Sequence, residues 1–384
     1  MGFVNALKPL KLARSGQADV ASNKLALSTF SRILRLMLPA ATATIISWFI
    51  CQLGAFEIGR QSDAFWLSAY TPVPSSNIFR AVVDLKDALR LTWTFGVDNP
   101  YDQPQWALIY LLQGSLMVIA ALLLTINMAP SWRLIVLTIC SAWSLNLSRQ
   151  MGDPWTGAAC YAGIMMGEFS LTTIPSRLSA MSKILSPPLA IFSLIVMSYS
   201  DSEPQNAPWN AVLYDFGLRY LPMDAGGGIT RTYGTIGGVL LVVSIIISPH
   251  LRWVLSRKPL LWLGKVSFAI YLLHGMVLRS VFAWILFIGV KKAEFREQDT
   301  DLVWHPEYRY PVPGIVRCAF ATIIAFAVIF GASHIWMLKV EPVFGKITST
   351  LEKVVCGKSS VGDLLDMSGK LSGEKESLLP IRQD

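Results

Sequence analysis

The feature that most constrains this chain is a series of long apolar runs, each suited to cross a bilayer as a helix. One of them covers residues 266–289, and about 20 consecutive apolar residues are enough to span the hydrocarbon core. Several runs of this kind within 384 residues argue against a pair of soluble domains. The chain is therefore predicted to be an all-α, polytopic integral membrane protein built as a helical bundle.

The composition agrees with a membrane protein. Only 15% of the residues are charged, whereas a soluble chain carries about 25%. The net charge of +8 would suit nucleic acid, but the Lys and Arg residues gather in alternate loops, so topology and contact with anionic lipid explain them better. The five cysteines show no C-x-x-C spacing, which predicts neither a disulfide framework nor a zinc site. We expect membrane lipids as partners, with no nucleic acid and no metal.

About eight transmembrane helices are predicted from the apolar runs. They cover residues 36–56, 106–126, 134–147, 155–172, 187–199, 233–248, 266–289 and 315–338. The fourth and fifth runs are the weakest, so the count changes by two if neither crosses the membrane. The polar segment before the second span is expected to hold an interfacial helix over residues 78–95.

The basic residues predict the orientation of the bundle. With eight alternating spans, the basic segments fall on one side; they are residues 1–35, 250–265 and 339–358. Cytosolic loops carry an excess of Lys and Arg, so both termini are predicted to be cytosolic.

Three regions follow from this topology. They are a basic cytosolic segment at 1–35, a transmembrane domain at 36–340, and a cytosolic, largely disordered tail at 341–384. The tail contains Glu374-Lys-Glu-Ser-Leu-Leu379, which reads as an acidic dileucine sorting signal or as a chance match.

Polar side chains within the seventh run predict a functional site. Ser267, Tyr271 and His274 recur at i, i+4 and i+7, so they share one helical face. The imidazole lies about eight residues into the span, roughly 12 Å deep at 1.5 Å per residue, where polar groups usually face a cavity or a partner. Glu168, in the fourth run, is placed at a similar depth, and a Glu–His pair would tune the imidazole as a general base. The alternative is that these residues only join helices through hydrogen bonds.

Three arginines in or near the predicted spans also stand out. Arg32 and Arg35 are spaced i, i+3 before the first span, where two guanidiniums on one face suit phosphate groups. The alternative is an ordinary basic flank of a membrane helix. Arg279 lies near the middle of the seventh run, where an unpaired charge would cost several kcal/mol. We therefore expect Arg279 to have a partner.

Several segments match one pattern in the same order along the chain. Leu263-Gly-Lys-Val-Ser-Phe-Ala-Ile-Tyr-Leu-Leu-His274 is similar to L-G-x-x-S-[FY]-x-x-Y-L-x-H, and Phe30-Ser-Arg-Ile-Leu-Arg-Leu-Met-Leu-Pro39 to R-x-x-R-L-x-x-P. Further matches are Asn99-Pro-Tyr-Asp102 through Gly114-Ser115, Tyr161-Ala-Gly163 through Glu168, and Val340-Glu-Pro342. Together they resemble the membrane acyltransferase 3 family, in particular its fungal branch.

The resemblance implies transfer of an acyl group, often acetyl from acetyl-CoA, to a hydroxyl of a sugar, lipid or secondary metabolite. In that hypothesis Arg32 and Arg35 bind the phosphates of the acyl-CoA, and His274 deprotonates the acceptor. Tyr271 and Ser267 orient the acceptor, and Glu168 biases the tautomer of the imidazole. An endomembrane location is expected rather than the plasma membrane.

Two departures from the family pattern keep other functions open. The family carries an N-terminal R-x10-H motif, and this chain is expected to lack it, because Gly2-Phe-Val-Asn-Ala-Leu-Lys-Pro9 resembles a segment that follows it. Leu111 stands where the family pattern has Glu. A catalytically inactive membrane subunit is therefore one alternative. A lipid or metabolite transporter is another, because intramembrane Arg279, Glu168 and His274 would suit a polar pathway, although no inverted repeat is visible.

Overall fold

The structure is a computed structural model, and it confirms a helical membrane protein. It describes residues 1–384 except 147–153, 179–180, 201–203, 222–227, 299–303 and 358–384. The described residues are almost entirely helical, with one antiparallel hairpin of β1 (Ala293–Gln298) and β2 (Trp304–Arg309). The predicted dileucine segment lies outside the described residues.

The first half of the chain forms a long helix followed by short helices and then three packed ones. The elements are α1 (Gly2–Arg14), α2 (Ala18–Gln52), α3 (Glu57–Arg60), α4 (Phe65–Ala69), α5 (Ile78–Leu91), the 3-10 turn η1 (Gln103–Gln105), α6 (Trp106–Thr125), α7 (Pro130–Asn146) and α8 (Pro154–Ser170). The predicted interfacial helix is α5. The basic segment 1–35 is itself helical, since it comprises α1 and the first half of α2.

The second half continues with helices on either side of the hairpin. The elements are α9 (Ile174–Leu178), α10 (Ser182–Met197), η2 (Pro204–Asn206), α11 (Pro208–Tyr220), α12 (Gly228–Ile247), α13 (Pro249–Leu255), α14 (Lys258–Val277), the π-helix η3 (Leu278–Phe282), α15 (Ala283–Phe287), α16 (Ile315–Ile335), the π-helix η4 (Trp336–Val340) and α17 (Glu341–Val355). The hairpin lies between the seventh and eighth predicted spans.

Five helical segments among the described residues are long and apolar enough to cross a membrane. They are Ala18–Gln52, Gln103–Thr125, Gly228–Ile247, Lys258–Phe287 and Ile315–Val355. These correspond to the first, second, sixth, seventh and eighth predicted spans. The other three predicted spans are the helices α7, α8 and α10, of 17, 17 and 16 residues. The count of about eight and the cytosolic termini stay predictions.

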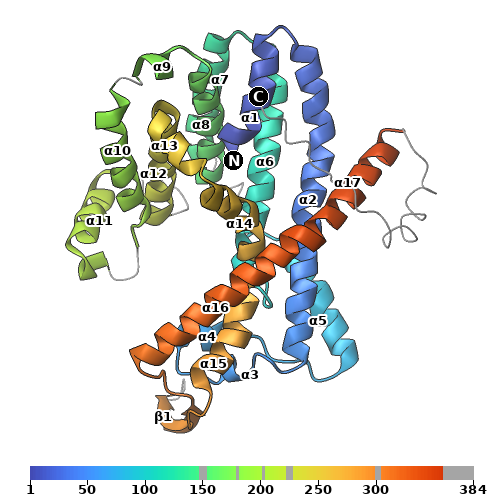
Figure 1. Ribbon diagram of the computed structural model, residues 1–384, viewed down its shortest axis with the longest axis vertical. Helices are drawn as coiled ribbons and strands as arrows, with labels where there is room; N and C mark the ends of the chain where they lie inside the picture. The colour runs from blue at the N-terminus through green and yellow to red at the C-terminus, as the bar shows by residue number, and fades with distance from the viewer. Residues whose placement is uncertain (147–153, 179–180, 201–203, 222–227, 299–303, 358–384) are drawn as a thin grey trace.

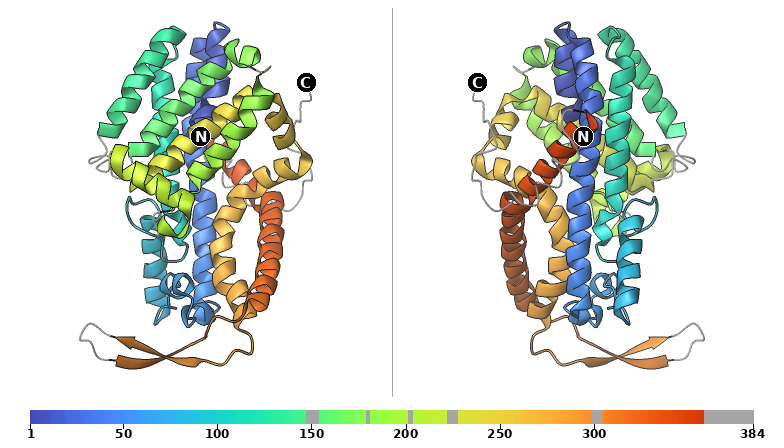
Figure 2. Two further views of the ribbon diagram at one scale, coloured as in Figure 1. Left: turned by 90° about the vertical axis from the view of Figure 1, so that its left-hand side faces the viewer. Right: turned by 90° about the vertical axis from the view of Figure 1, so that its right-hand side faces the viewer.

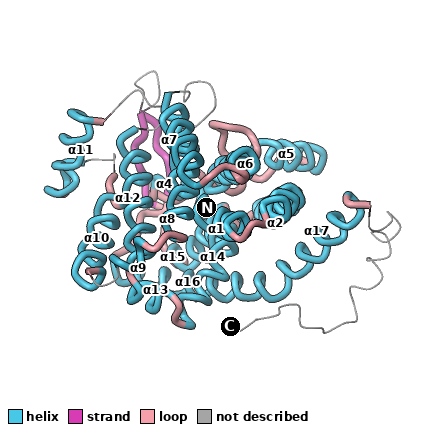
Figure 3. Tube along the Cα trace, turned by 90° about the horizontal axis from the view of Figure 1, so that it is seen from above, coloured by secondary structure: helices cyan, strands magenta, loops and turns pink. Residues whose placement is uncertain are grey.

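Helix α2 runs through almost the whole length of the molecule and joins two groups of helices (Figure 1). The first group, α1, α6, α7, α8, α10 and α12, lies to one side of its upper half (Figure 1). The second group, α14 to α16 with the short helices α3 to α5, accompanies its lower half. The hairpin projects from the lower end (Figure 2). Seen from above, α1 lies between α2 and α8 (Figure 3).

Helix α1 is packed tightly inside the first group. Ala6 and Leu10 are fully buried. A Cβ added to Gly163 of α8 would lie 2.7 Å from Cα of Gly2, so only glycine allows the two backbones to approach this closely. Small residues at crossings of this kind are typical of membrane helix pairs. Helix α1 therefore belongs to the helical bundle and is not a loosely attached flanking segment.

A buried cluster of three charges ties α1, α7 and α8 together. Glu168 is 1% exposed and pairs with Arg14, at 2.6 Å, and with Arg133. Arg133 is 2% exposed and also donates to the carbonyl oxygens of Thr125, Ile126 and Met128. These carbonyls belong to the last residue of α6, to its C-cap and to the turn that follows, where backbone carbonyls have no partner within the helix. The cluster therefore fixes four helices at one point.

We predict that Glu168→Ala strongly destabilises the protein, because it leaves the buried Arg133 without its counter-charge. The expected loss is about 3–5 kcal/mol. The matched control is Glu57→Ala, which breaks the Glu57–Arg60 pair whose side chains are 37% and 39% exposed, and which should cost about 0–1 kcal/mol. The thermal unfolding midpoint in detergent measures both variants. Equal midpoints for the two would contradict a structural role for the Glu168 cluster.

Candidate active site

A polar segment before α6, residues 99–105, is buried between α2 and α5. The amide of Asn99 donates to Thr44 of α2 at 3.0 Å and to Thr92 at the end of α5 at 2.8 Å. The backbone carbonyl of Tyr101 accepts a hydrogen bond from Ser47 of α2 at 2.6 Å. Asn99 itself is fully buried. Buried polar groups need such partners, and here the partners hold the segment in one conformation.

The buried segment also carries the counter-charge of Arg279. Asp102 is fully buried and lies 3.5 Å from the guanidinium of Arg279, while Gln105 donates to the second carboxylate oxygen at 2.9 Å. The Arg279 side chain also donates to the carbonyls of Gly275 and Tyr70. Burial raises the pKa of the Asp102 carboxyl to about 6, and Arg279 acts against that rise. The expectation that Arg279 has a partner is confirmed.

Arg279 lies in η3, where the helix that starts as α14 widens into a π-turn. Such turns often accompany functional sites. Gly275, one turn earlier, allows α14 to approach the buried segment, since an added Cβ would lie 2.6 Å from Oδ1 of Asp102. The position of α14 is thus set by the Asp102–Arg279 pair.

Tyr271 and His274 lie just before this anchor. The hydroxyl of Tyr271 donates to the carbonyl of Pro104 in the buried segment, and its ring centroid is 6.2 Å from that of His274. Nδ1 of His274 lies 2.8 Å from the Tyr271 carbonyl and 3.1 Å from that of Ile270. Carbonyl oxygens only accept hydrogen bonds, so this geometry favours a proton on Nδ1. The neutral ring then keeps a lone pair on Nε2, as a general base requires.

Ser267 is the outlying member of the predicted face. Its side chain is exposed and its hydroxyl donates to the carbonyl of Gly264 in the same helix, at 2.9 Å. Tyr271, by contrast, points at the buried segment. The structure therefore brings Tyr271 and His274 together and leaves Ser267 apart from them.

The prediction that Glu168 pairs with His274 is wrong. Both carboxylate oxygens of Glu168 are occupied by Arg14 and Arg133. The physical reason is the packing of α8, which lies against α1 and α7, so that Arg14 and Arg133 of those two helices reach the carboxylate. The backbone carbonyls of α14, and not Glu168, set the tautomer.

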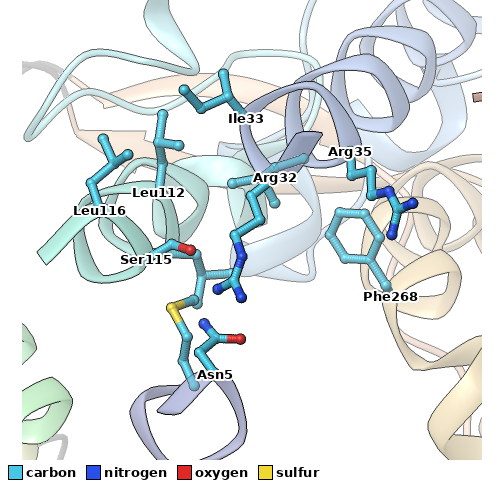
Figure 4. A pocket seen from close by; sticks show the side chains of 11 residues that line it. Asn5, Arg32, Ile33, Arg35, Leu112, Ser115, Leu116 and Phe268 are labelled. Carbon is cyan, nitrogen blue, oxygen red and sulfur yellow. The ribbon is translucent and has the colours of Figure 1, made fainter. Parts of the chain in front are cut away.

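Arg32 and Arg35 line a cavity of about 470 Å³ between α1, α2, α6 and α14, here called the arginine cavity. Arg32 points toward Asn5 and Ser115, and Arg35 lies beside the ring of Phe268 (Figure 4). Within the part of the chain that the structure describes, neither arginine has an acidic partner within 4.0 Å. Two unpaired guanidiniums facing one cavity favour an anionic ligand.

Phe268 connects the arginine cavity to His274 along one face of α14. Its ring stacks on that of Tyr271 with the centroids 6.4 Å apart. The ring of Tyr271 in turn lies next to that of His274, three residues further along the helix. Phe268 as a cavity residue and the buried segment as an anchor were not predicted from the sequence. Their signals were present, since Phe268 lies within the matched signature and Asp102 within the Tyr-Asp match. Leu111, which replaces a Glu of the family pattern, also lines this cavity.

The fold is that of a helical protein with several helices long and apolar enough to cross a membrane, and comparison with known proteins gives its family. The acyltransferase domain family matches residues 23–334, that is, from the start of α2 to the end of α16. The chain belongs to this family.

One relative and one negative result complete the comparison. The chain is 23% identical over 311 residues to O-acetyltransferase PaAT-1 of Phomopsis amygdali, a match that covers 73% of this chain and 60% of that protein. The chain thus spans less than two thirds of the length of this relative. No solved structure matches. In the described residues, no group of three or more His, Cys, Asp or Glu is placed to hold a metal ion.

We predict opposite effects for two glycine substitutions in α14. Gly275→Ala places a methyl group against Asp102 and Arg279, and overpacking of this kind costs about 1–3 kcal/mol. Gly264→Ala meets nothing within 4 Å and should stabilise the helix by up to about 1 kcal/mol. Thermal unfolding of the two purified variants measures the difference. A Gly275→Ala protein as stable as Gly264→Ala would refute the tight contact at Asp102.

Proposed function

We propose that the protein is a membrane O-acyltransferase that moves an acyl group, acetyl in the simplest case, from acyl-CoA to a hydroxyl of a small molecule. The observation that carries this proposal is the arginine cavity. Arg32 and Arg35 face it with no acidic partner among the residues that the structure describes, and its wall includes Phe268, which belongs to the same helix as His274. A candidate site for an anionic donor and a candidate general base thus involve the same helix, with Phe268 and His274 six residues apart on α14.

The lining of the arginine cavity suits acyl-CoA. The guanidiniums offer paired N–H donors to phosphate oxygens. The remaining wall is mostly apolar, with Leu111, Leu112 and Leu116 of α6, and would bury the thioester arm. Leu111 adds no negative charge near the arginines, so it is compatible with donor binding even though the family pattern has Glu there.

The proposed reaction uses His274 as general base. Nε2 takes the proton of the acceptor hydroxyl while its oxygen attacks the thioester carbonyl. A C–O bond forms, the C–S bond breaks, and the leaving thiolate recovers the proton from the imidazolium. Tyr271 is held by Pro104 and would keep the imidazole and acceptor in place, with Ser267 at the edge of the site. In this proposal Glu168 has a structural role and takes no part in the reaction.

The proposed cellular setting follows the charge distribution. Basic residues at 1–35, 250–265 and 339–358 favour the cytosolic side, where acyl-CoA would reach Arg32 and Arg35. We propose a multi-pass endomembrane protein with an acceptor from secondary metabolism.

We predict that His274→Gln lowers kcat for acetyl transfer about 10²–10⁴-fold, because it removes the general base but keeps the shape of the side chain. The KM for acetyl-CoA should change little. The matched control is Ser267→Ala, which should keep most of the activity because Ser267 bonds only to its own helix. Transfer is measured in membranes with labelled acetyl-CoA and a panel of alcohols. Full turnover by His274→Gln would refute the role of His274, and no transfer by the unaltered protein would favour an inactive subunit.

A further inference from the structure

A second cavity lies on the other side of the N-terminal end of α1. It has a volume of about 480 Å³ and is lined by residues of α1, α6, α8 and α12. Its walls include Trp106, Trp155, Gly234 and Gly238, and we call it the tryptophan cavity. Neither the donor site nor His274 accounts for it.

We propose that the tryptophan cavity binds the acyl acceptor, and that this acceptor is an alcohol with a flat, apolar body and not a free sugar. This inference rests on the proposed function and adds the chemical class of the second substrate.

The chemistry of the walls carries the choice of an apolar body. Two indole rings face the cavity together with Met166, Val239 and Val242. Apolar surface removed from water in such a space favours binding. A sugar would lose water from several hydroxyls and find few polar partners on these walls. The lining thus selects an apolar ligand with a small number of polar groups.

The shape of the cavity favours a flat ligand. Gly234 and Gly238 lie one turn apart on the same face of α12, and a Cβ added to either meets nothing within 4 Å. Gly237, on another face, differs, because a Cβ there would lie 2.8 Å from the carbonyl oxygen of Ser193. Close helix packing therefore explains Gly237 but not the other two. Gly234 and Gly238 leave a smooth wall and free space beside it.

The polar side chains that line the cavity, apart from its two indoles, are Arg231 and Thr235 of α12 and Thr156 of α8. The guanidinium of Arg231 lies 5.9 Å from the ring centroids of both Trp106 and Tyr110, and aromatic rings hold a cation in this way. Thr235 follows one turn later on α12 and also lines the cavity. These groups suit a hydroxyl-bearing ligand with one polar end.

The two cavities meet at Met1. Its side chain lines both of them, and a Cβ on Gly114 of α6 would lie 3.7 Å from its sulfur. Methionine is flexible, so a ligand in the tryptophan cavity can extend its hydroxyl past this residue. Ser115 and Phe268 line the arginine cavity beyond. The acceptor and donor sites are therefore neighbours with a movable side chain between them.

Photolabelling of the full-length protein in nanodiscs tests the assignment. A diazirine-bearing sterol is the flat apolar alcohol, and a diazirine-bearing hexose is the sugar. We expect the sterol to label peptides of α8 and α12, and Gly238→Leu or Gly234→Leu to reduce that labelling at least about tenfold by filling the cavity. Gly331→Leu is the matched control, since Gly331 of α16 is also an open helical glycine but does not line the cavity.

The outcomes separate this proposal from the proposed function. Photolabelling does not require acyl transfer, so sterol labelling would support the acceptor site even if the protein transfers no acetyl group. Sterol labelling that persists in Gly238→Leu, or labelling of α8 and α12 by the hexose instead, would overturn the assignment. Where an alcohol is acetylated, Gly238→Leu should raise the KM for that alcohol about tenfold and leave the KM for acetyl-CoA unchanged. A change in the acetyl-CoA value alone would also overturn it.

Discussion

The buried pair of Asp102 and Arg279 is the interaction on which the candidate site depends. A buried charge is tolerated only with a counter-charge and hydrogen bonds, and the segment at 99–105 supplies both. The same segment accepts the hydroxyl of Tyr271 through Pro104 and is held by α2 and α5. The position of His274 relative to the rest of the bundle therefore follows from one buried polar segment.

A second buried charge cluster fixes the other wall of the arginine cavity. Glu168 binds Arg14 of α1 and Arg133 of α7, and α1 brings Asn5 to the cavity. The Asp102–Arg279 pair holds α14, which brings Phe268. The cavity thus forms where two groups of helices meet along α2, each held by its own buried ion pairs. Among the described residues Arg32 and Arg35 have no acidic partner there, which is why the cavity is suited to an anion.

Much of the helical framework could be predicted from hydropathy, but the start of α14 could not. The predicted span 106–126 agrees closely with α6, and the i, i+3 spacing of Arg32 and Arg35 placed both on one cavity. The start of α14 lies eight residues before the predicted span, because its first two turns include Lys258 and Lys265 and follow Arg257, a basic composition that resembles a loop. A helix can therefore begin before its apolar run does.

The sequence predicted that a side chain has a partner only where leaving the side chain unpaired would be energetically costly. A guanidinium in mid-span requires a partner, and Arg279 has one. Which acid supplies it depends on contacts between segments far apart in the chain. Asp102 belongs to a polar stretch that sequence alone places in a solvated loop, and Glu168 was assigned to the wrong partner for the same reason. The two π-turns and the hairpin left no signal in the apolar pattern.

Binding of a non-hydrolysable thioether analogue of acetyl-CoA tests the central claim most directly. Calorimetry on the purified protein gives its Kd. Replacement of both arginines, Arg32→Gln with Arg35→Gln, should weaken binding more than about tenfold, since each charge-assisted hydrogen bond contributes about 1.5–3 kcal/mol. The control, Arg252→Gln with Arg257→Gln on the basic turn before α14, should leave Kd unchanged. Equal affinity of the unaltered protein and the Arg32/Arg35 variant would contradict the donor site proposed for the arginine cavity.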